Sequence, residues 1–212
     1  MNISASKETI LKKIRQALSQ KVPLPFSGTE GNHSVFNPPY DDLAVQFAEA
    51  FTSLEGKFIF CENEKSAIHQ LMELAASQQW NKIYCKEERL TDLIHQLYPG
   101  FSFYHDLAHC DVSVTGCELL VSRTGSLVLS SAQQHGRTAS VYAPVHICIA
   151  YTHQLVHDLK DAIIFLKNKY GSQLPSSISF ATGPSRTADI EKTLVVGVHG
   201  PGQVYVILVD EG

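Results

Sequence analysis

The residues best suited to chemistry lie close together near the end of the chain, in the segment GPSRTADIE at positions 183–191. The polar side chains of this segment are Ser185, Arg186, Thr187, Asp189 and Glu191. Arginine carries a fork of N–H donors that fits a carboxylate or a phosphate, and a glycine such as Gly183 lets a backbone amide approach the same ligand. We therefore predict that Gly183, Ser185, Arg186 and Thr187 bind a small anion.

Three side chains in and after this segment can transfer protons, namely Asp189, Glu191 and His199. We predict that they are catalytic, since carboxylates and imidazole are the usual acid–base groups of enzymes. Structural alternatives stay open for each of them. Asp189 could neutralise Arg186, Glu191 could face water at the start of a helix, where carboxylates are favoured, and His199 could fix its loop by a hydrogen bond.

A second polar turn, Arg123-Thr124-Gly125-Ser126, enters an apolar run. Backbone amides and hydroxyls in such a turn can hold an anion, although a glycine turn is also an ordinary hairpin connection. We predict that Thr124, Gly125 and Ser126 bind the ligand, together with Arg137 from the polar loop 133–138. The turn at 124–126, the segment 183–191 and His199 are then expected to converge on one anion-binding cleft at a sheet edge.

No set of residues has the spacing of a metal site. His146 and His199 are far apart in the sequence, and we expect His146 to be a core histidine that is satisfied by hydrogen bonds. His153 and His157 lie four residues apart without a third ligand nearby, so we predict no metal and leave their role open. The five cysteines occur singly, without a CxxC pair, and are expected to be reduced packing residues.

Composition excludes several classes of protein. The chain has 212 residues, of which 44% are hydrophobic and 18% charged, enough for one main domain. A net charge of −4 argues against nucleic acid as a partner. No apolar run approaches the roughly 20 residues that cross a bilayer, and the charged, amphipathic beginning of the sequence does not resemble a signal peptide. We expect a cytoplasmic protein without a membrane span.

Periodicity divides the chain into an N-terminal helix with a Pro/Gly-rich arm, residues 1–40, and an α/β domain, residues 41–212. Helices are predicted over 42–54, 64–77, 88–97 and 154–169. Strands are predicted over 58–61, 82–85, 112–115, 119–121, 127–129, 140–142, 145–150, 178–181, 194–196 and 204–209, with 194–196 buried. Alternating strands and helices indicate a mixed, mostly parallel sheet with helices on both faces, and the ends of its strands are the natural place for a site.

Several strings in order along the chain resemble the lactate-utilization (LUD) domain family: TGSLVL at 124–129, TGPSRTADIE at 182–191 and LVVGVHGPGQVYVILVD at 194–210, with Arg137, Pro144 and His146. The resemblance implies a fold related to glucosamine-phosphate deaminase, ribose-phosphate isomerase and the CoA-transferases. It implies a subunit that supports oxidation of L-lactate to pyruvate together with an iron–sulfur protein and other subunits of a lactate utilization system.

The chain itself lacks the cysteine motifs of an iron–sulfur protein, so we expect no cofactor in it and clusters only in a partner. It would then be a non-redox subunit of the lactate-oxidising complex. The alternative is a stand-alone enzyme or binding protein for a small anionic or phosphorylated metabolite. Formation of a homo-oligomer stays open.

Overall fold

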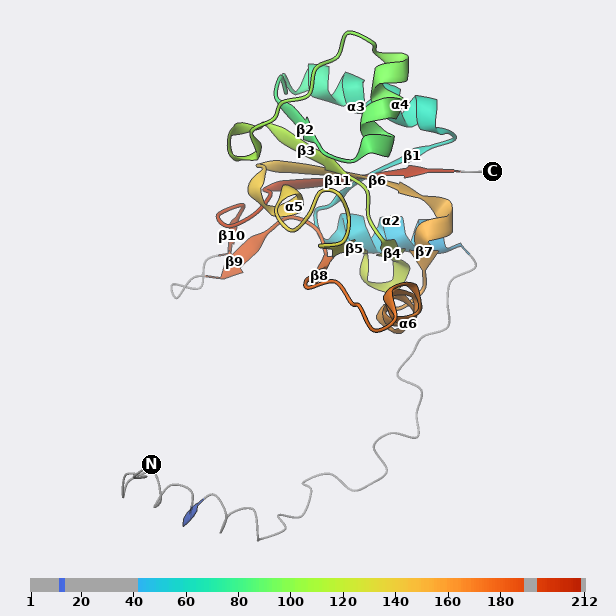
Figure 1. Ribbon diagram of the computed structural model, residues 1–212, viewed down its shortest axis with the longest axis vertical. Coiled ribbons are helices and arrows are strands. Elements are labelled where there is room, and N and C mark those ends of the chain that lie inside the picture. Colours follow the sequence, from blue (N-terminus) through green and yellow to red (C-terminus); the bar gives the residue numbers. More distant parts are fainter. Residues whose placement is uncertain (1–11, 14–41, 189–193, 211–212) are drawn as a thin grey trace. The chain divides into compact units, whose positions relative to one another are not determined.

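A computed structural model describes residues 12–13, 42–188 and 194–210, and its centre is a parallel sheet of five strands (Figure 1). In spatial order these are β1 (Lys57–Cys61), β11 (Gln203–Val209), β6 (Val145–Tyr151), β3 (Val112–Thr115) and β2 (Ile83–Cys85). Strand β6 is buried at every position, and β11 at every position after Gln203. Continuous apolar runs of this kind are typical of parallel strands that are covered on both faces.

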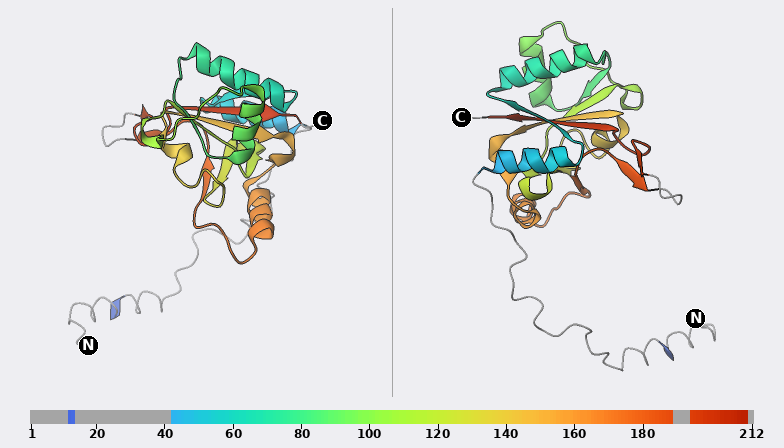
Figure 2. Two further views of the ribbon diagram at one scale, coloured as in Figure 1. Left: turned by 45° about the horizontal axis from the view of Figure 1, so that its top comes forward. Right: turned by 180° about the vertical axis from the view of Figure 1, so that it is seen from behind.

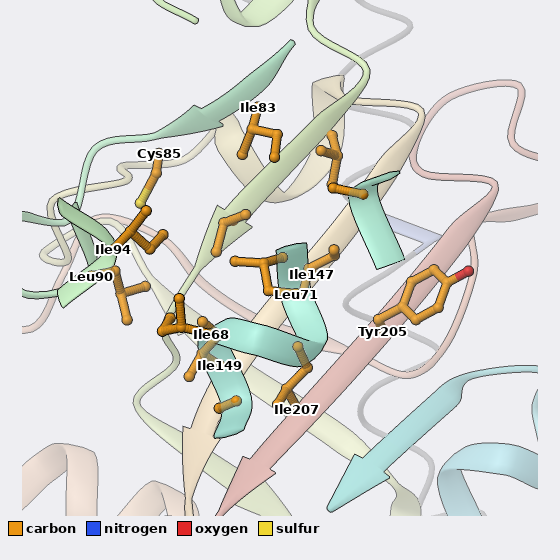
Figure 3. Packing of buried hydrophobic residues seen from close by; sticks show 14 of the residues in the cluster. Ile68, Leu71, Ile83, Cys85, Leu90, Ile94, Ile147, Ile149, Tyr205 and Ile207 are labelled. Atoms are coloured by element: carbon orange, nitrogen blue, oxygen red, sulfur yellow. The ribbon is translucent and has the colours of Figure 1, made fainter. Parts of the chain in front are cut away.

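Two helices cover one face of this sheet (Figure 1 and Figure 2). They are α3 (Glu64–Ser77), which follows β1, and α4 (Glu88–Leu97), which follows β2. The Asn63 side chain caps α3 by accepting a hydrogen bond from the Ser66 amide at 2.9 Å. Figure 3 shows Ile68 and Leu71 of α3 packed with Ile147 and Ile149 of β6 in the core of this layer.

The opposite face of the parallel sheet is covered by helix α2 (Leu43–Ser53) and by a second sheet (Figure 2). Asp42 caps α2, since its side chain accepts from the Ala44 amide at 2.8 Å. The rings of Phe47 and Phe51 stack 5.4 Å apart and are fully buried beneath the sheet. The spacing of these two residues places both on the inner side of the helix.

The second sheet has four strands and mixed directions. In spatial order they are β7 (Leu155–Val156), β4 (Leu119–Val121), β5 (Ser126–Ser130) and β8 (Ile178–Ala181). The β4–β5 and β5–β8 pairs are antiparallel, whereas β4 and β7 are parallel. Helix α6 (Leu159–Tyr170) packs Ala162 and Leu166 against this sheet. A separate antiparallel pair consists of β9 (Arg186–Ala188) and β10 (Leu194–Val196).

The predicted α/β class, with a largely parallel sheet and helices on both of its faces, is confirmed. The chain divides into Met1–Pro38 and Pro39–Gly212, and only the second unit is considered below. The helix and arm predicted for residues 1–40 lie outside the described residues, except for Lys12 and Lys13, which are helical. In the described ranges no helix is long and apolar enough to cross a membrane.

Three local predictions are wrong. Residues 140–142 are not a strand but part of the one-turn helix α5 (Ala139–Tyr142), whose Ala139 is buried while Tyr142 is 65% exposed. The helix predicted from residue 154 begins at Leu159, where Asp158 and Asp161 form a reciprocal cap. Strand β10 is not buried, since the pairing of β10 with β9 leaves Val195 42% exposed.

Candidate functional site

The carboxyl ends of three parallel strands open into a cavity of about 500 Å³. Glu87 follows β2, Cys117 follows β3 and His153 follows β6, and all three line this cavity. The opposite wall comes from β4 and from the last turn of α6, which contributes Lys169 and Tyr170. The carboxyl edge of a parallel sheet is where α/β proteins bind their ligands, because the loops that follow the strands converge there.

Glu118 is the most completely coordinated side chain of the cavity. Its Oε1 accepts hydrogen bonds from Ser130 Oγ and from the Tyr170 hydroxyl, each at 2.5 Å. Its Oε2 accepts from Lys169 Nζ at 2.7 Å. The pairing of β4 with β5 brings Glu118 beside Ser130, and α6 supplies the other two donors from adjacent positions on its last turn.

The network keeps Glu118 charged although only 1% of its side chain is exposed. Burial by itself raises the pKa of Glu118, but the hydrogen bonds from Lys169, Ser130 and Tyr170 outweigh it and hold the pKa below its usual value. Burial lowers the pKa of Lys169, but the hydrogen bond and the charge of Glu118, together with smaller contributions from Tyr170, outweigh it, so the pKa of Lys169 is raised. The site therefore holds a fixed ammonium–carboxylate pair whose Lys169 side chain is 47% exposed.

A second carboxylate, that of Glu87, has a different environment. Its Oε1 accepts from the Gly116 amide at 2.8 Å. A β-carbon on Gly116 would lie 2.8 Å from Glu87 Oε2, so a larger residue there would require this carboxylate to shift. Glu87 is the N-cap residue of α4, but its side chain makes no capping hydrogen bond, and the amide of Glu88 donates to Gln134 Oε1 at 2.8 Å. The Glu87 side chain is thus left at the cavity, and it also lines an adjoining pocket of about 130 Å³.

The histidines have several different surroundings. His146 is buried, and its Nε2 lies 2.8 Å from the Thr115 hydroxyl, as expected for a satisfied core histidine. Burial lowers the pKa of His146 to about 3, with a further contribution from nearby His135. His153 lines the cavity, and His157 Nδ1 lies 3.2 Å from Gln46 Oε1. In the part of the chain that the structure describes, no three metal-binding side chains lie close enough to hold an ion.

The predicted ligand-binding residues lie at the other end of the strands. Arg186 Nη2 donates to the Leu54 carbonyl at 2.9 Å and lies 3.4 Å from the Glu55 carboxylate, both just after α2 and before β1. Ser185 is tied by its backbone, because its amide donates to the Pro201 carbonyl and its carbonyl accepts from Gly197, both at 2.9 Å. Thr187 pairs with Val195 across β9 and β10. Arg186 therefore binds the last carbonyls of α2, as cations favourably do.

The two predicted glycines also meet the end of α2. Both have positive φ, +60° at Gly125 and +83° at Gly183. A β-carbon at Gly125 would lie 2.5 Å from the Phe51 nitrogen, and one at Gly183 would lie 2.7 Å from the Leu54 carbonyl oxygen. In this structure the two glycines are needed for contact with the helix backbone, and an additional role in anion binding stays a prediction.

Part of the expected convergence is present. Ser126 Oγ lies 2.7 Å from the hydroxyls of both Thr124 and Thr182, so the turn at 124–126 contacts the residue directly before the 183–191 segment. His199 instead lines a separate pocket of about 530 Å³ with Tyr142 and Pro144, at the amino ends of β6 and β11.

Among the described residues, Arg137 is not brought into this group. Arg137 donates to Ser176 Oγ, away from these residues. Asp189 and Glu191 lie outside the described residues.

Sequence reasoning missed the residues at the carboxyl edge, namely Glu87, Glu118, Lys169 and Tyr170. A weak signal existed for one of them. Glu118 is the only charged residue between the apolar runs 112–115 and 119–121, where a carboxylate is costly unless it has partners. The alternation of strands and helices predicts a site at the strand ends, but local polar density points to other residues.

Comparison with known proteins identifies the family. The LUD domain model matches residues 44–209. The Lactate utilization protein C of Bacillus licheniformis is 37% identical over 103 residues, 48% of this chain and 43% of that protein. The protein of the same name from Bacillus subtilis is 36% identical over 103 residues, again 48% of this chain and 43% of the relative. The matched region thus spans less than half the length of these curated relatives.

A solved structure agrees with the fold. The crystal structure of a DUF162 family protein from Deinococcus radiodurans superposes with a TM-score of 0.57, covering 79% of this chain and 96% of that chain at 18% sequence identity. The likeness at this identity concerns the fold, while the family model spans nearly the whole of the described α/β unit. The chain belongs to the LUD domain family.

Proposed function

We propose that this chain acts in lactate utilization, as a subunit that supports the oxidation of L-lactate to pyruvate together with iron–sulfur partner proteins. Membership of the LUD domain family and the similarity to proteins named Lactate utilization protein C support this role. The cavity at the carboxyl edge of the parallel sheet is the proposed ligand site.

The observation that carries the proposal is the Lys169 ammonium, held at the cavity by buried Glu118. An ammonium fixed in this way attracts a small carboxylate without having to be ordered when the ligand binds. Gln133 and Gln134 also line the cavity, and each uses its side-chain oxygen to bind a backbone amide. Their NH₂ groups supply further donors for the carboxylate of a ligand such as L-lactate.

Oxidation of L-lactate to pyruvate removes two electrons and two protons. We assign the electrons to the iron–sulfur partner and expect no redox cofactor in this chain. The role of this chain is then to hold the hydroxy acid, or the partner that carries it, in a fixed orientation. Orientation alone can contribute several kcal/mol to a reaction.

The test measures L-lactate binding to the purified chain by calorimetry and growth on lactate of a strain that depends on the chain. The variant is the double substitution Glu118→Gln with Lys169→Met, which removes the cation without leaving a buried carboxylate unpaired. We expect it to fold, to lose L-lactate binding and to stop growth. Lys167→Met, on the exposed side of α6, is the matched control and retains both.

Unchanged lactate binding by the double variant would remove this cavity as the site. Co-purification from lactate-grown cells, followed by identification of the bound proteins, tests the iron–sulfur partner separately. Turnover of a phosphorylated metabolite by the purified chain alone would instead favour a stand-alone enzyme.

A further inference from the structure

The two carboxylates of the cavity differ in the number of their hydrogen-bond donors. Glu118 accepts from three side chains, so its oxygens are committed to the ion pair and its two companions. Glu87 accepts only from the Gly116 amide, through Oε1, and among the described residues Oε2 has no donor. With 17% of its side chain exposed, Glu87 is accessible from the cavity and from the adjoining pocket. Of the four carboxylate oxygens that these two residues bring to the cavity, Glu87 Oε2 is the one without a donor among the described residues.

The buried ring of His135 lies next to the Glu87 carboxylate. The His135 side chain is 1% exposed, and its Nε2 is 3.8 Å from Glu87 Oε1. Neither ring nitrogen has a partner with good hydrogen-bond geometry among the described residues, although the Gly136 backbone lies close to the ring. A buried polar group left in this state destabilises the fold, so the arrangement needs a reason.

The loop that carries His135 is held in place around the cavity. Gln134 binds the first amide of α4 at 2.8 Å, and Gln133 binds the Ser130 amide at 3.1 Å. Gly136 turns the chain with φ +68°. The imidazole is therefore positioned mainly by its neighbours in sequence, including the Gly136 backbone next to the ring.

We propose that Glu87 is the proton acceptor of this cavity and that His135 is its positioning residue. In the liganded protein Nε2–H of His135 donates to Glu87 Oε1, and Oε2 accepts the hydroxyl proton of the bound 2-hydroxy acid. A distance of 3.8 Å fits this role, because hydrogen bonds of catalytic groups are often long before the ligand binds. The inference rests on the proposed function for the identity of the ligand.

The proton and electron count is balanced within that function. As the carbonyl of pyruvate forms, the O–H bond breaks and its proton goes to Glu87. The C2–H bond would also break, with its proton released to water and its two electrons taken up one at a time by the iron–sulfur clusters of the partner. Glu118 cannot take the Glu87 role while three donors hold its charge in place.

Burial has the largest effect on His135 and lowers its pKa, whereas Glu87, a backbone hydrogen bond at Gly136 and Glu118 act in the opposite direction. The cavity and the adjoining pocket also bring several charged or titratable side chains close to Glu87, namely Arg89, Cys117, His153, Lys169 and Tyr170. The neighbouring imidazole is that of His146, and the thiols that face Glu87 are Cys85 and Cys148. His135 is therefore neutral near pH 7 and has one N–H to donate.

The test compares Glu87→Gln and His135→Asn with two matched controls, Glu88→Gln and His105→Asn, both at exposed positions. Each variant replaces the wild-type protein in cells with no other lactate-oxidising enzyme, and lactate-dependent dye reduction is measured in extracts at equal protein level. L-lactate affinity is measured on the purified chains. Glu87→Gln keeps an oxygen for the Gly116 amide, so the fold is expected to persist.

We expect Glu87→Gln to bind L-lactate within about threefold of wild type but to lose roughly 100-fold or more in dye reduction, as for loss of a general base. His135→Asn should lower the rate of dye reduction about tenfold. It should also move the acid limb of the pH–rate profile to higher pH, because Glu87 loses a donor that favours its charged form. The controls should match wild type.

Two results would overturn the inference, and only one of them would also overturn the proposed function. Wild-type rates in Glu87→Gln, with L-lactate still bound, would overturn the inference alone. Failure of the wild-type chain to bind L-lactate would overturn the proposed function and the inference with it. If His135→Asn fails to fold, the isosteric Glu87→Gln decides the outcome.

Discussion

At the scale of single residues, Glu118 shows how a carboxylate stays charged inside a protein. Burial penalises its ionised form, and three donors on neighbouring elements more than compensate. Lys169 is half exposed, so its attraction to Glu118 is partly screened by solvent and the hydrogen bonds of Ser130 and Tyr170 matter as much as the charge. Removal of one partner and removal of both should therefore have different effects.

A double-mutant cycle tests this difference. Lys169→Met alone should lower the free energy of unfolding by about 1–3 kcal/mol, because Glu118 is left buried with only two neutral donors. Adding Glu118→Gln should restore about 1 kcal/mol or more of that loss, because no buried charge remains. Urea unfolding of the four proteins measures the coupling. Additive losses would mean that the two side chains are energetically independent.

The low pKa of His146 predicts how the stability of the folded protein depends on pH. Its pKa in the folded protein, about 3, is below the value of roughly 6.5 for an unfolded histidine. The unfolded chain therefore binds more protons between these values, and stability is complete above pH 6.5 and falls as the pH drops toward 3. The slope from one such histidine is at most about 1.4 kcal/mol per pH unit.

His146→Gln should flatten this slope, whatever it does to stability at pH 7. Urea unfolding between pH 6.5 and 4.5 measures it in a range above most carboxylate titrations. His105→Asn, an exposed change, serves as control and should keep the wild-type slope. A wild-type slope in His146→Gln would assign the pH dependence to other groups, of which His135 is the first to examine.

At the scale of elements, the end of α2 is a common contact point for three segments that are far from it in the sequence. The turn at Gly125, the segment at Gly183 and the side chain of Arg186 all contact residues between Phe51 and Glu55. These contacts connect the second sheet to the amino end of β1. Substitutions there change the packing of several elements at once, and a loss of function from them would not by itself identify a ligand site.

A pair of glycine substitutions tests this role of Gly125. Gly125 and Gly136 both have positive φ, but a β-carbon would meet the α2 backbone only at Gly125 and open space at Gly136. Gly136→Ala should lower the free energy of unfolding by about 1–2 kcal/mol from backbone conformation alone. Gly125→Ala should lower it by at least about 2 kcal/mol more, because Phe51 must also move. Equal losses in urea unfolding would show that the contact is easily relieved.

The elements were predictable from the sequence where one local pattern determines them. Buried parallel strands such as β6 and β11 read as apolar runs, and α3 shows a helical period with an Asn63 cap. Helix α5 was not predictable, since a single turn offers too few residues for a period. Strand β10 has an apolar sequence, but its exposure depends on which strand it pairs with.

The site was less predictable than the fold for a physical reason. Glu118, Ser130 and Lys169 lie far apart in the sequence and meet through strand pairing and the packing of α6. Arg186, in contrast, stands in a dense local group of polar residues but binds the carbonyl of Leu54. A cluster of polar residues in the sequence indicates side chains that could do chemistry. It does not show which side chains the fold brings together in one cavity.

At the scale of the whole molecule, the reactivity of the five cysteine thiols shows whether the core is folded. All five are free and buried, and burial raises the pKa of the Cys85 thiol to about 12. They come from strands and loops on both sides of the parallel sheet. No single local opening would expose all of them.

Thiol labelling turns this into a prediction. At pH 8 the folded protein should react with DTNB far more slowly than the protein unfolded in guanidinium, which should show five thiols. Anaerobic purification followed by iron and sulfide assays should find neither in stoichiometric amount. Stoichiometric iron, or one thiol that reacts rapidly in the folded protein, would contradict the assignment of the cysteines to packing.

The position of β11 has a consequence for how the chain is made. This strand lies between β1 and β6, and β1 has no other partner among the described strands. Lys57 on β1 and Tyr205 on β11 are separated by 148 positions. At a translation rate of about 5–20 residues per second, β1 leaves the ribosome on the order of 10 s before its partner is complete. During that time its edge is open to other chains, so the nascent protein should depend on chaperones that shield unpaired strands.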